Sequence, residues 1–258
     1  MSVNSYLKNL ASELVLSESE KDHVATSVNT IKGRLDSYFE SEVTEKNVFG
    51  SYERGTILPR KADEDSDVDI MVVFGSNPHG YKPQTFLNKL KAFAEHYYST
   101  SEIYQSSPTI VLELNHIKFE LTPSYLLYGT YYIPNGQSDW MTTDPDGFSI
   151  TLMECNKSND YKIKPIIRLL KYWNIQKNSR DMKSYKLEEE IADGLMYSYY
   201  SCSSYTDYLK AGFKEIKYNT DYSNVNTAID YIDKAICYEE QGMSETALLE
   251  IKKAFPEI

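Results

Sequence analysis

The sequence lacks the features of membrane, secreted and disulfide-bonded proteins. It has no run of eighteen or more apolar residues, and its first residues lack the basic start and apolar stretch of a secretory signal. Its three cysteines, Cys155, Cys202 and Cys237, are far apart and show no metal-ligand spacing such as C-x-x-C. Such cysteines are typical of reduced thiols, and we assign them no function. We therefore expect a soluble, cytoplasmic protein with no membrane partner.

The sequence also lacks a long Pro/Gly/Ser-rich linker, an internal repeat and a low-complexity segment. Its 258 residues can bury a sizeable core, as one large domain or as two intimately packed lobes. Two common phosphate-binding motifs, G-x-x-x-x-G-K-[ST] and G-x-G-x-x-G, are absent. A nucleotide site in this chain would therefore be of another type, one that relies on metal ions.

Acidic residues outnumber basic ones, 38 to 27, and the formal charge is −11. Such a charge disfavours polyanionic ligands, because phosphate binding needs a positive local field. Residues 157–186, however, carry a net charge of +7, so the remainder carries −18. The basic residues of this segment are Lys157, Lys162, Lys164, Arg168, Lys171, Lys177, Arg180, Lys183 and Lys186. The segment is either a solvated helix face or a basic wall that faces an anion.

Hydrophobic periodicity predicts an α+β protein: helix, a small mixed sheet, then a helical lobe. A capping-box pattern at Ser17–Glu20 marks a helix start within the helical first forty residues. Asn115 is the expected turn of an antiparallel strand pair. The helical period changes around Lys46, and Val48-Phe49 leads into Gly50-Ser51. The other expected elements are strands at 68–74, 109–114 and 116–121, helices at 83–98, 186–200, 206–216, 225–240 and 244–254, and a helical stripe at 166–173. The aromatic segment from 124 to 147 is expected to be irregular.

Two carboxylates stand at the head of the predicted strand 68–74. Side chains alternate along a strand, so Asp67 and Asp69 face the same way, with Cα atoms about 6.5 to 7 Å apart. Glu120 lies on the polar face of the later strand 116–121, and it joins the aspartates if the two strands are neighbours. Three hard oxygen ligands on one face would bind Mg²⁺ or Mn²⁺ together with substrate phosphate oxygens.

A D-x-D pair alone is also typical of the solvent face of an edge strand. Adjacent like charges repel without a counter-cation, which favours a metal site. Gly50 and Ser51 precede the pair at a loop distance: Gly50 lets the backbone approach a phosphate, and Ser51 offers a hydroxyl and an amide. Asp63 and Asp65 offer a competing register, and we prefer the later pair because the apolar strand begins there.

These motifs resemble the nucleotidyltransferase superfamily of DNA polymerase beta, and within it the branch of the bacterial cGAS/DncV-like nucleotidyltransferases (CD-NTases) and the oligoadenylate synthases. The resemblance covers about residues 45–190. The matching segments are Gly50–Thr56, Asp67–Ile70 and Ile117–Pro123 for the superfamily, and Ile133–Pro134, Trp140, Asp144–Pro145, Leu169–Asn174 and Lys183–Glu188 for the branch. One departure is Glu120, because the third carboxylate of this branch is usually Asp.

The resemblance implies a nucleotidyltransferase palm with an N-terminal helix over residues 1–145 and a C-terminal helical domain over residues 146–258. The N-terminal helix would pack on the helical lobe, and an active-site cleft would lie between the lobes. Asp67, Asp69 and Glu120 would be catalytic and would hold two Mg²⁺ (or Mn²⁺) ions.

The resemblance also implies nucleotide-binding residues. Gly50, Ser51, Lys171 and Ser184 would contact the donor triphosphate, and Tyr185 would stack on the donor base. From the residues alone, Lys171 is equally an exposed helix lysine, Ser184 a helix cap and Tyr185 a core aromatic.

The implied reaction is attack of a 3′- or 2′-hydroxyl on the α-phosphorus of ATP, GTP, CTP or UTP, with pyrophosphate leaving. The first hypothesis takes a second nucleotide as acceptor, which gives a linear and then cyclic second messenger, as in bacterial anti-phage signalling; the branch also admits a regulatory protein partner. The second is transfer to an RNA 3′ end or other acceptor, as in CCA-adding or terminal transferases, which the charge of −18 outside the basic segment disfavours. The third is a non-catalytic nucleotide-binding regulator, which the intact carboxylates disfavour.

Overall fold

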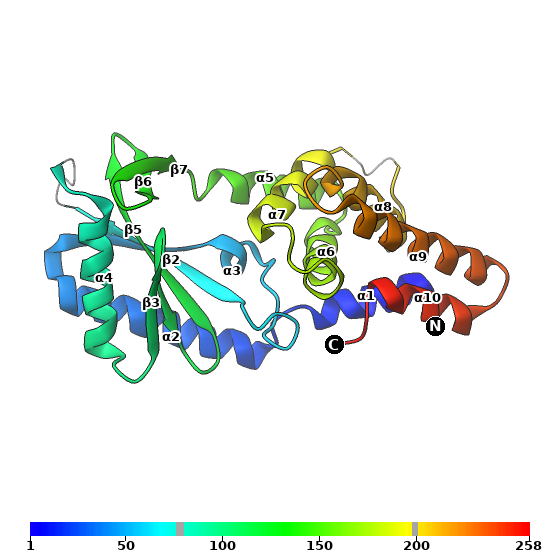
Figure 1. The fold of residues 1–258 in the computed structure, drawn as a ribbon, viewed down its shortest axis with the longest axis horizontal. Coiled ribbons are helices and arrows are strands. Elements are labelled where there is room, and N and C mark those ends of the chain that lie inside the picture. The colour runs from blue at the N-terminus through cyan, green and yellow to red at the C-terminus, as the bar shows by residue number, and fades with distance from the viewer. Residues whose placement is uncertain (76–79, 198–200) are drawn as a thin grey trace. The chain divides into compact units, whose positions relative to one another are not determined.

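A computed structural model describes residues 1–75, 80–197 and 201–258 (Figure 1). The chain forms two compact units, which we call the helical unit and the sheet unit. The helical unit comprises Met1–Val15, Gly55–Glu64 and Phe148–Ile258, and the sheet unit comprises Leu16–Arg54 and Asp65–Gly147. The predicted division at residue 145 follows chain order alone, whereas the helical unit also takes in two segments from the N-terminal part of the chain.

The sheet unit contains a mixed β-sheet. Its main path runs β1-β2-β5-β4-β3, where β2 and β5 are parallel and the other neighbours are antiparallel. The strands are β1 (Val43–Phe49), β2 (Asp67–Phe74), β3 (Glu102–Ser106), β4 (Thr109–Glu113) and β5 (Lys118–Leu127). The predicted antiparallel pair is confirmed as β4 and β5, and β3 is a strand that the periodicity did not predict.

The prediction of an irregular segment between residues 124 and 147 is wrong. The chain there extends β5 and then forms a hairpin of β6 (Thr130–Asn135) and β7 (Asp139–Thr143). The aromatic residues of this segment favour a strand, and they pack across it. The rings of Tyr125 and Tyr132 stack with their centroids 4.8 Å apart, and Trp140 meets Tyr125 edge-on.

Helices α2 (Glu18–Phe39) and α4 (Pro83–Tyr97) complete the sheet unit, with the short η1 (Glu40–Glu42) and α3 (Gly50–Arg54). The predicted capping box is confirmed, because Ser17 and Glu20 each accept the other's backbone N–H at the start of α2. The buried residues of α2 recur at helical spacing: Val24, Val28, Ile31, Leu35 and Phe39. Strand β1 follows η1 and ends directly before α3, which begins with the Gly-Ser turn.

The helical unit has seven helices among its described residues: α1 (Val3–Glu13), α5 (Gly147–Ser158), α6 (Ile163–Lys177), α7 (Ser184–Gly194), α8 (Tyr205–Ile216), α9 (Tyr222–Glu240) and α10 (Ser244–Ala254). The helix predicted over 186–200 is α7, which begins two residues earlier and ends at Gly194; residues 198–200 lie outside the described residues. Within the described ranges, none of the helices of either unit is both long and apolar enough to cross a membrane.

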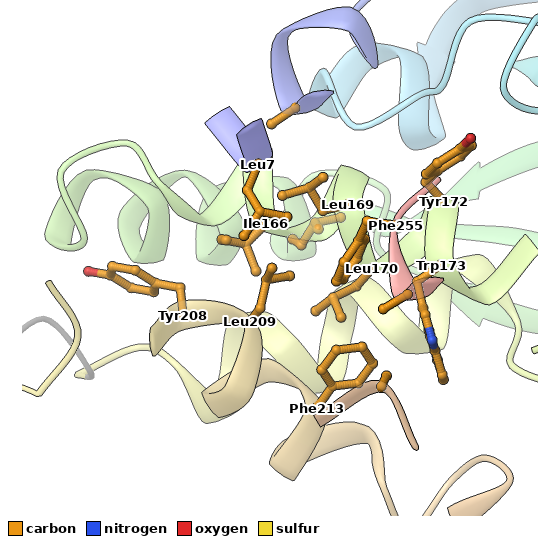
Figure 2. Packing of buried hydrophobic residues seen from close by; sticks show 14 of the residues in the cluster. Leu7, Ile166, Leu169, Leu170, Tyr172, Trp173, Tyr208, Leu209, Phe213 and Phe255 are labelled. Carbon is orange, nitrogen blue, oxygen red and sulfur yellow. The ribbon is translucent and has the colours of Figure 1, made fainter. Parts of the chain in front are cut away.

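The core of the helical unit forms around α6 (Figure 2). The predicted stripe of this helix is fully buried, and Trp173 packs edge-on against Phe213 of α8 with centroids 4.8 Å apart. Helix α1 joins this core: the Tyr6 hydroxyl donates to the carbonyl of Phe255 at 2.7 Å, and the backbone N–H of Val3 donates to Glu239 at 2.8 Å. The predicted packing of the N-terminal helix on the helical lobe is therefore confirmed for α1.

Candidate active site

The three predicted metal-binding carboxylates lie on one face of the sheet unit. In the parallel register of β2 and β5, Asp69 is the neighbour of Glu120 and Asp67 the neighbour of Lys118. All four side chains are half-buried, whereas the alternating residues between them, Val68 and Phe119, are fully buried on the other face. The strands are thus neighbours, as the grouping of these carboxylates required.

The start of β2 decides between the two candidate acid pairs. The strand begins at Asp67, so the later pair is the one that alternates on a strand. Asp63 lies in the helical unit, where its carboxylate accepts from the Arg180 guanidinium at 2.8 Å. Asp65 lies before the strand and is 3.8 Å from the ammonium of Lys118. The structure therefore places Asp63 in the other unit and leaves Asp65 outside the strand that carries Asp69.

The Gly-Ser turn packs directly on the carboxylate of Asp69. Phe49, the last residue of β1, is the cross-strand neighbour of Asp69, and α3 begins at the next residue. Gly50 has φ +74°, and a Cβ at this position would lie 1.9 Å from the Oδ2 of Asp69. Only glycine fits this backbone conformation and this approach together. Ser51 follows in α3, so its hydroxyl is carried by the same turn.

Neighbouring strands orient Glu120 and make its face negative. The hydroxyl of Thr109, on β4, donates to the Oε2 of Glu120 at 3.2 Å. Tyr104, on β3, donates its hydroxyl to Glu113 at 3.3 Å. Burial raises the pKa of Tyr104, and the negative charges of Glu113, Glu102 and Glu120 raise it further. A cation is therefore the kind of ligand that this face favours.

The carboxylates do not form a closed ligand cage. Among the described residues, no group of three or more His, Cys, Asp or Glu side chains converges as a metal-binding set. Mg²⁺ does not need one, since it is usually held by one or two carboxylates together with waters and substrate phosphates. The donors on this face are hard carboxylate oxygens, and Gly50 brings the backbone close to one of them. The residues present therefore fit a Mg²⁺ or Mn²⁺ ion that binds with its nucleotide.

Lys171, predicted to contact the triphosphate, lies on α6 and is only 6% exposed. Its ammonium donates to the carbonyl of Thr56 at 3.0 Å and to Glu188 at 3.1 Å. Glu188, on α7, is fully buried and also accepts the hydroxyl of Thr56 at 2.9 Å. The alternative of an exposed helix lysine is therefore wrong, and Lys171 is a cation held rigidly by buried partners.

Ser184 and Tyr185 form the first turn of α7. The N-cap of this helix is Lys183, so Ser184 is its first residue rather than its cap. The Tyr185 side chain is 51% exposed, and its ring lies edge-on to Phe148 with centroids 5.2 Å apart. The alternatives of a capping serine and a core tyrosine are thus both wrong. Contact of these residues with a nucleotide stays a prediction.

Lys171 and Ser184 line one pocket of about 220 Å³ in the helical unit. The other lining residues are Asp63, Asn174, Ile175, Arg180, Met182 and Lys183. The structure thus brings together two of the predicted triphosphate contacts. It adds Arg180 and Lys183, two cations of the basic segment to which the sequence alone assigns no role. The signal that could have found them is the placement of Arg180 and Lys183, which lie four residues and one residue before Ser184.

The architecture is that of a polymerase beta-type nucleotidyltransferase: a small mixed sheet with the Gly-Ser turn and the D-x-D strand, and a unit of helices. The chain belongs to the SMODS family, the Second Messenger Oligonucleotide or Dinucleotide Synthetase domain, whose model matches residues 1–156. The sequence resemblance to the cGAS/DncV-like branch is thereby confirmed.

Two relatives support this family. The chain is 28% identical over 189 residues to a probable cyclic nucleotide synthase of Bacillus cereus, a match that covers 61% of this chain and 57% of the relative. It is 24% identical over 192 residues to a cyclic AMP-AMP-AMP synthase of an Acinetobacter species, which covers 71% of this chain and 55% of the relative. The chain thus spans a little over half the length of these curated relatives.

Solved structures confirm the fold. Vibrio cholerae DncV, a cyclic AMP-GMP synthase, matches with a TM-score of 0.80 at 13% identity, over 98% of this chain and 96% of that one. Escherichia coli CdnC, solved in complex with HORMA-deltaN, matches with a TM-score of 0.73 at 14% identity, over 98% of both chains. At these identities the likeness shows the fold alone.

Proposed function

We propose that this chain is a metal-dependent nucleotidyltransferase that joins nucleoside triphosphates into an oligonucleotide second messenger, linear and then cyclic, with release of pyrophosphate. The observation that carries the proposal is the parallel register that places Glu120 beside Asp69 on the face that also holds Asp67. The family match and the names of the two relatives support the same chemistry.

In this proposal Asp67, Asp69 and Glu120 hold two Mg²⁺ or Mn²⁺ ions. When bound, such ions neutralise the charge that develops on the attacking and leaving oxygens. The Glu120 carboxylate, oriented by the hydroxyl of Thr109, accepts or directs the proton of the attacking 3′- or 2′-hydroxyl. The backbone approach at Gly50 keeps the turn and the Asp69 carboxylate in a fixed relation.

The remaining residues bind the donor nucleotide. Ser51 and Ser184 supply hydroxyl donors to the phosphates, and the exposed ring of Tyr185 stacks on the base. Lys171 supplies a positive charge that its contacts with Thr56 and Glu188 hold in place before the reaction begins. Fixed charges of this kind are effective because they need no reorganisation during the reaction.

The test is to incubate the purified protein with labelled ATP, GTP, CTP and UTP and with Mg²⁺ or Mn²⁺, and then to treat the products with phosphatase. We expect phosphatase-resistant cyclic products from the wild type and none from Asp69→Asn. Glu95→Gln is the control, since it removes an exposed carboxylate from α4 of the same unit and should leave product formation intact.

Two outcomes would contradict the proposal. Incorporation only when RNA is added would indicate transfer to an RNA end. Nucleotide binding with no product under any of these conditions would indicate the non-catalytic regulator. Substantial activity in Asp69→Asn would leave the reaction in place but show that the metal ligands are assigned incorrectly.

A further inference from the structure

The 220 Å³ pocket of the helical unit carries more positive charge than its predicted phosphate contacts explain. Three cations line it, Lys171, Arg180 and Lys183, against one carboxylate, Asp63. The charge of Lys171 is matched by its buried partner Glu188. Arg180 is paired with Asp63, so the excess positive charge of the pocket comes from Lys183. No motif or comparison assigns a function to Arg180 or to Lys183.

The loop that carries Arg180 is held by two buried asparagines. Asn174, on α6, donates from its amide to the carbonyl of Met182 at 2.8 Å and accepts the backbone N–H of Met182 at 3.3 Å. Asn178 donates to the amide oxygen of Asn174 at 2.8 Å and to the hydroxyl of Thr220 at 2.6 Å. Satisfied polar networks of this kind fix one conformation of a loop.

The backbone of this loop adopts a conformation that ordinary residues avoid. Ser179 has φ 51° and Arg180 has φ 57°, both in the left-handed region, and neither is a glycine. The backbone N–H of Arg180 donates to the carbonyl of Asn174 at 2.8 Å, which holds the turn. Such strain persists only where the surrounding structure imposes it, and it concentrates at functional sites. Arg180 thus lines the pocket with its backbone in a conformation that is unfavourable for a residue other than glycine.

Asp63 is the anion that Arg180 contacts in this structure. Their charged groups are 2.8 Å apart, and the Asp63 side chain is only 15% exposed. A guanidinium is a planar fork of donors that matches phosphate oxygens as well as it matches a carboxylate. A phosphate that carries more charge than a carboxylate can therefore replace Asp63 on Arg180.

The size of the pocket limits which part of a nucleotide it accepts. Pockets that enclose whole drug-sized ligands are about 300 to 1,000 Å³, so a pocket of 220 Å³ accepts only part of a nucleoside triphosphate. Ser184 lines the pocket, whereas Tyr185, the proposed base contact, is not among the lining residues. The phosphate end of the nucleotide is thus the part that matches the charge of the pocket.

We propose that Arg180 and Lys183 bind the terminal phosphate of the nucleoside triphosphate, and that Asp63 is the counter-anion which this phosphate replaces. This inference rests on the proposed function, because it takes a triphosphate as the substrate. If the terminal phosphate binds here, the pocket distinguishes a nucleoside triphosphate from a nucleoside diphosphate.

The test compares the binding of α,β-methylene-ATP and α,β-methylene-ADP, with Mg²⁺, by titration calorimetry. We expect Arg180→Met and Lys183→Met each to weaken binding of the triphosphate analogue by roughly tenfold to a hundredfold, the value of a charge-assisted hydrogen bond, and to change the diphosphate analogue far less. Asp63→Asn keeps an acceptor for Arg180 but removes the competing charge, so it should tighten triphosphate binding by roughly threefold to tenfold.

Lys177→Met is the matched control. Lys177 belongs to the same basic segment and ends the same helix, but it lines a different pocket with Trp173 and Tyr231. This variant should bind both analogues as the wild type does.

The outcomes separate the two proposals. If the wild type binds neither analogue, the proposed function fails. If the wild type binds the triphosphate analogue, and Arg180→Met weakens both analogues equally or neither, the terminal-phosphate role is overturned while the proposed function stands. Asp63→Asn keeps the test decisive should Arg180→Met not fold, because weaker triphosphate binding in that variant would also overturn the role.

Discussion

The α-carbon of Gly50 lies so close to the carboxylate of Asp69 that a Cβ would come within 1.9 Å of Oδ2. A methyl group there must displace either the turn or the carboxylate. Because a displacement of about 1 Å at a catalytic group can cost about a hundredfold in rate, we expect Gly50→Ala to lose about that much product formation. The measurement is the initial rate at saturating nucleotide, with folding checked by thermal denaturation.

Gly136→Ala is the control for backbone strain. Gly136 has φ +73°, nearly the value at Gly50, but a Cβ there meets no atom within 4 Å. Both alanine variants should therefore lose about 1 kcal/mol of stability from the left-handed backbone, and only Gly50→Ala should lose activity. Equal activity of the two variants would show that the contact with Asp69 has no catalytic importance.

Glu120 is predicted to act through its negative charge. Glu120→Gln keeps the size of the side chain and its capacity to accept from Thr109, so the fold should be preserved. Loss of a general base or metal ligand costs about a hundredfold to ten-thousandfold in rate. Glu120→Asp keeps the charge on a shorter side chain and should retain more activity than Glu120→Gln. The reverse order of the two variants would show that reach, not charge, decides.

The parts of this protein that could be predicted from the sequence are those encoded by the spacing of residues within one helix, strand or turn. The stripe of α6, the capping box at Ser17 and the strand that begins at Asp67 are patterns within a few residues, so they were predicted correctly. Even the grouping of the carboxylates needed only one further condition, that two strands be neighbours. Register then follows from alternation, because a slip of one residue would bury the charged face.

The parts that could not be predicted depend on partners far apart in the sequence. The burial of Lys171 depends on Glu188 and on Thr56, which lies 115 residues earlier. Asp63 was weighed as a metal ligand, but its partner is Arg180. The spacing of residues in the sequence indicates on which face of its own helix or strand a side chain lies. The residue that the side chain contacts there is determined by the tertiary fold.

The three cysteines should differ in reactivity. Burial raises the pKa of Cys155 to about 12, so at pH 8 its thiol is neutral and shielded, whereas Cys237 is exposed. Iodoacetamide should therefore modify Cys237 first and Cys155 only after denaturation, as mass spectrometry of the peptides would show. Between about pH 9 and 12 only the unfolded state ionises this thiol, so its contribution to stability should be lost as the pH rises through that range. Rapid native labelling of Cys155 would contradict its burial.

Tyr185 is predicted to bind the base through its ring. Tyr185→Phe keeps the ring and should leave KM for the donor nucleotide nearly unchanged, whereas Tyr185→Ala should raise KM. Stacking of a base on an aromatic side chain is worth about 1 to 3 kcal/mol, so the rise should be roughly fivefold to a hundredfold. Because the ring is half-exposed and contacts Phe148 at one edge, its removal should cost little stability. A large loss of thermal stability in Tyr185→Ala would instead indicate a packing role.

The pair Lys171 and Glu188 allows structure and substrate binding to be separated. Lys171→Met leaves the fully buried Glu188 without its cation, and breaking a buried pair in this way costs about 3 to 5 kcal/mol. The free energy of unfolding, measured by denaturant titration, should fall by that amount. The single variant alone cannot assign a role to Lys171, since a destabilised protein also binds nucleotide poorly.

The double variant Lys171→Met/Glu188→Leu removes both charges and replaces them with apolar side chains. Such replacements are often neutral for stability, so the free energy of unfolding should return close to the wild-type value. A small deficit should remain, because the hydroxyl of Thr56 loses its hydrogen bond to Glu188. If Lys171 supplies positive potential to the triphosphate, KM for the nucleotide stays raised in this stable double variant. If Lys171 only stabilises the fold, KM returns to the wild-type value along with stability. That result would show that Lys171 does not bind the nucleotide.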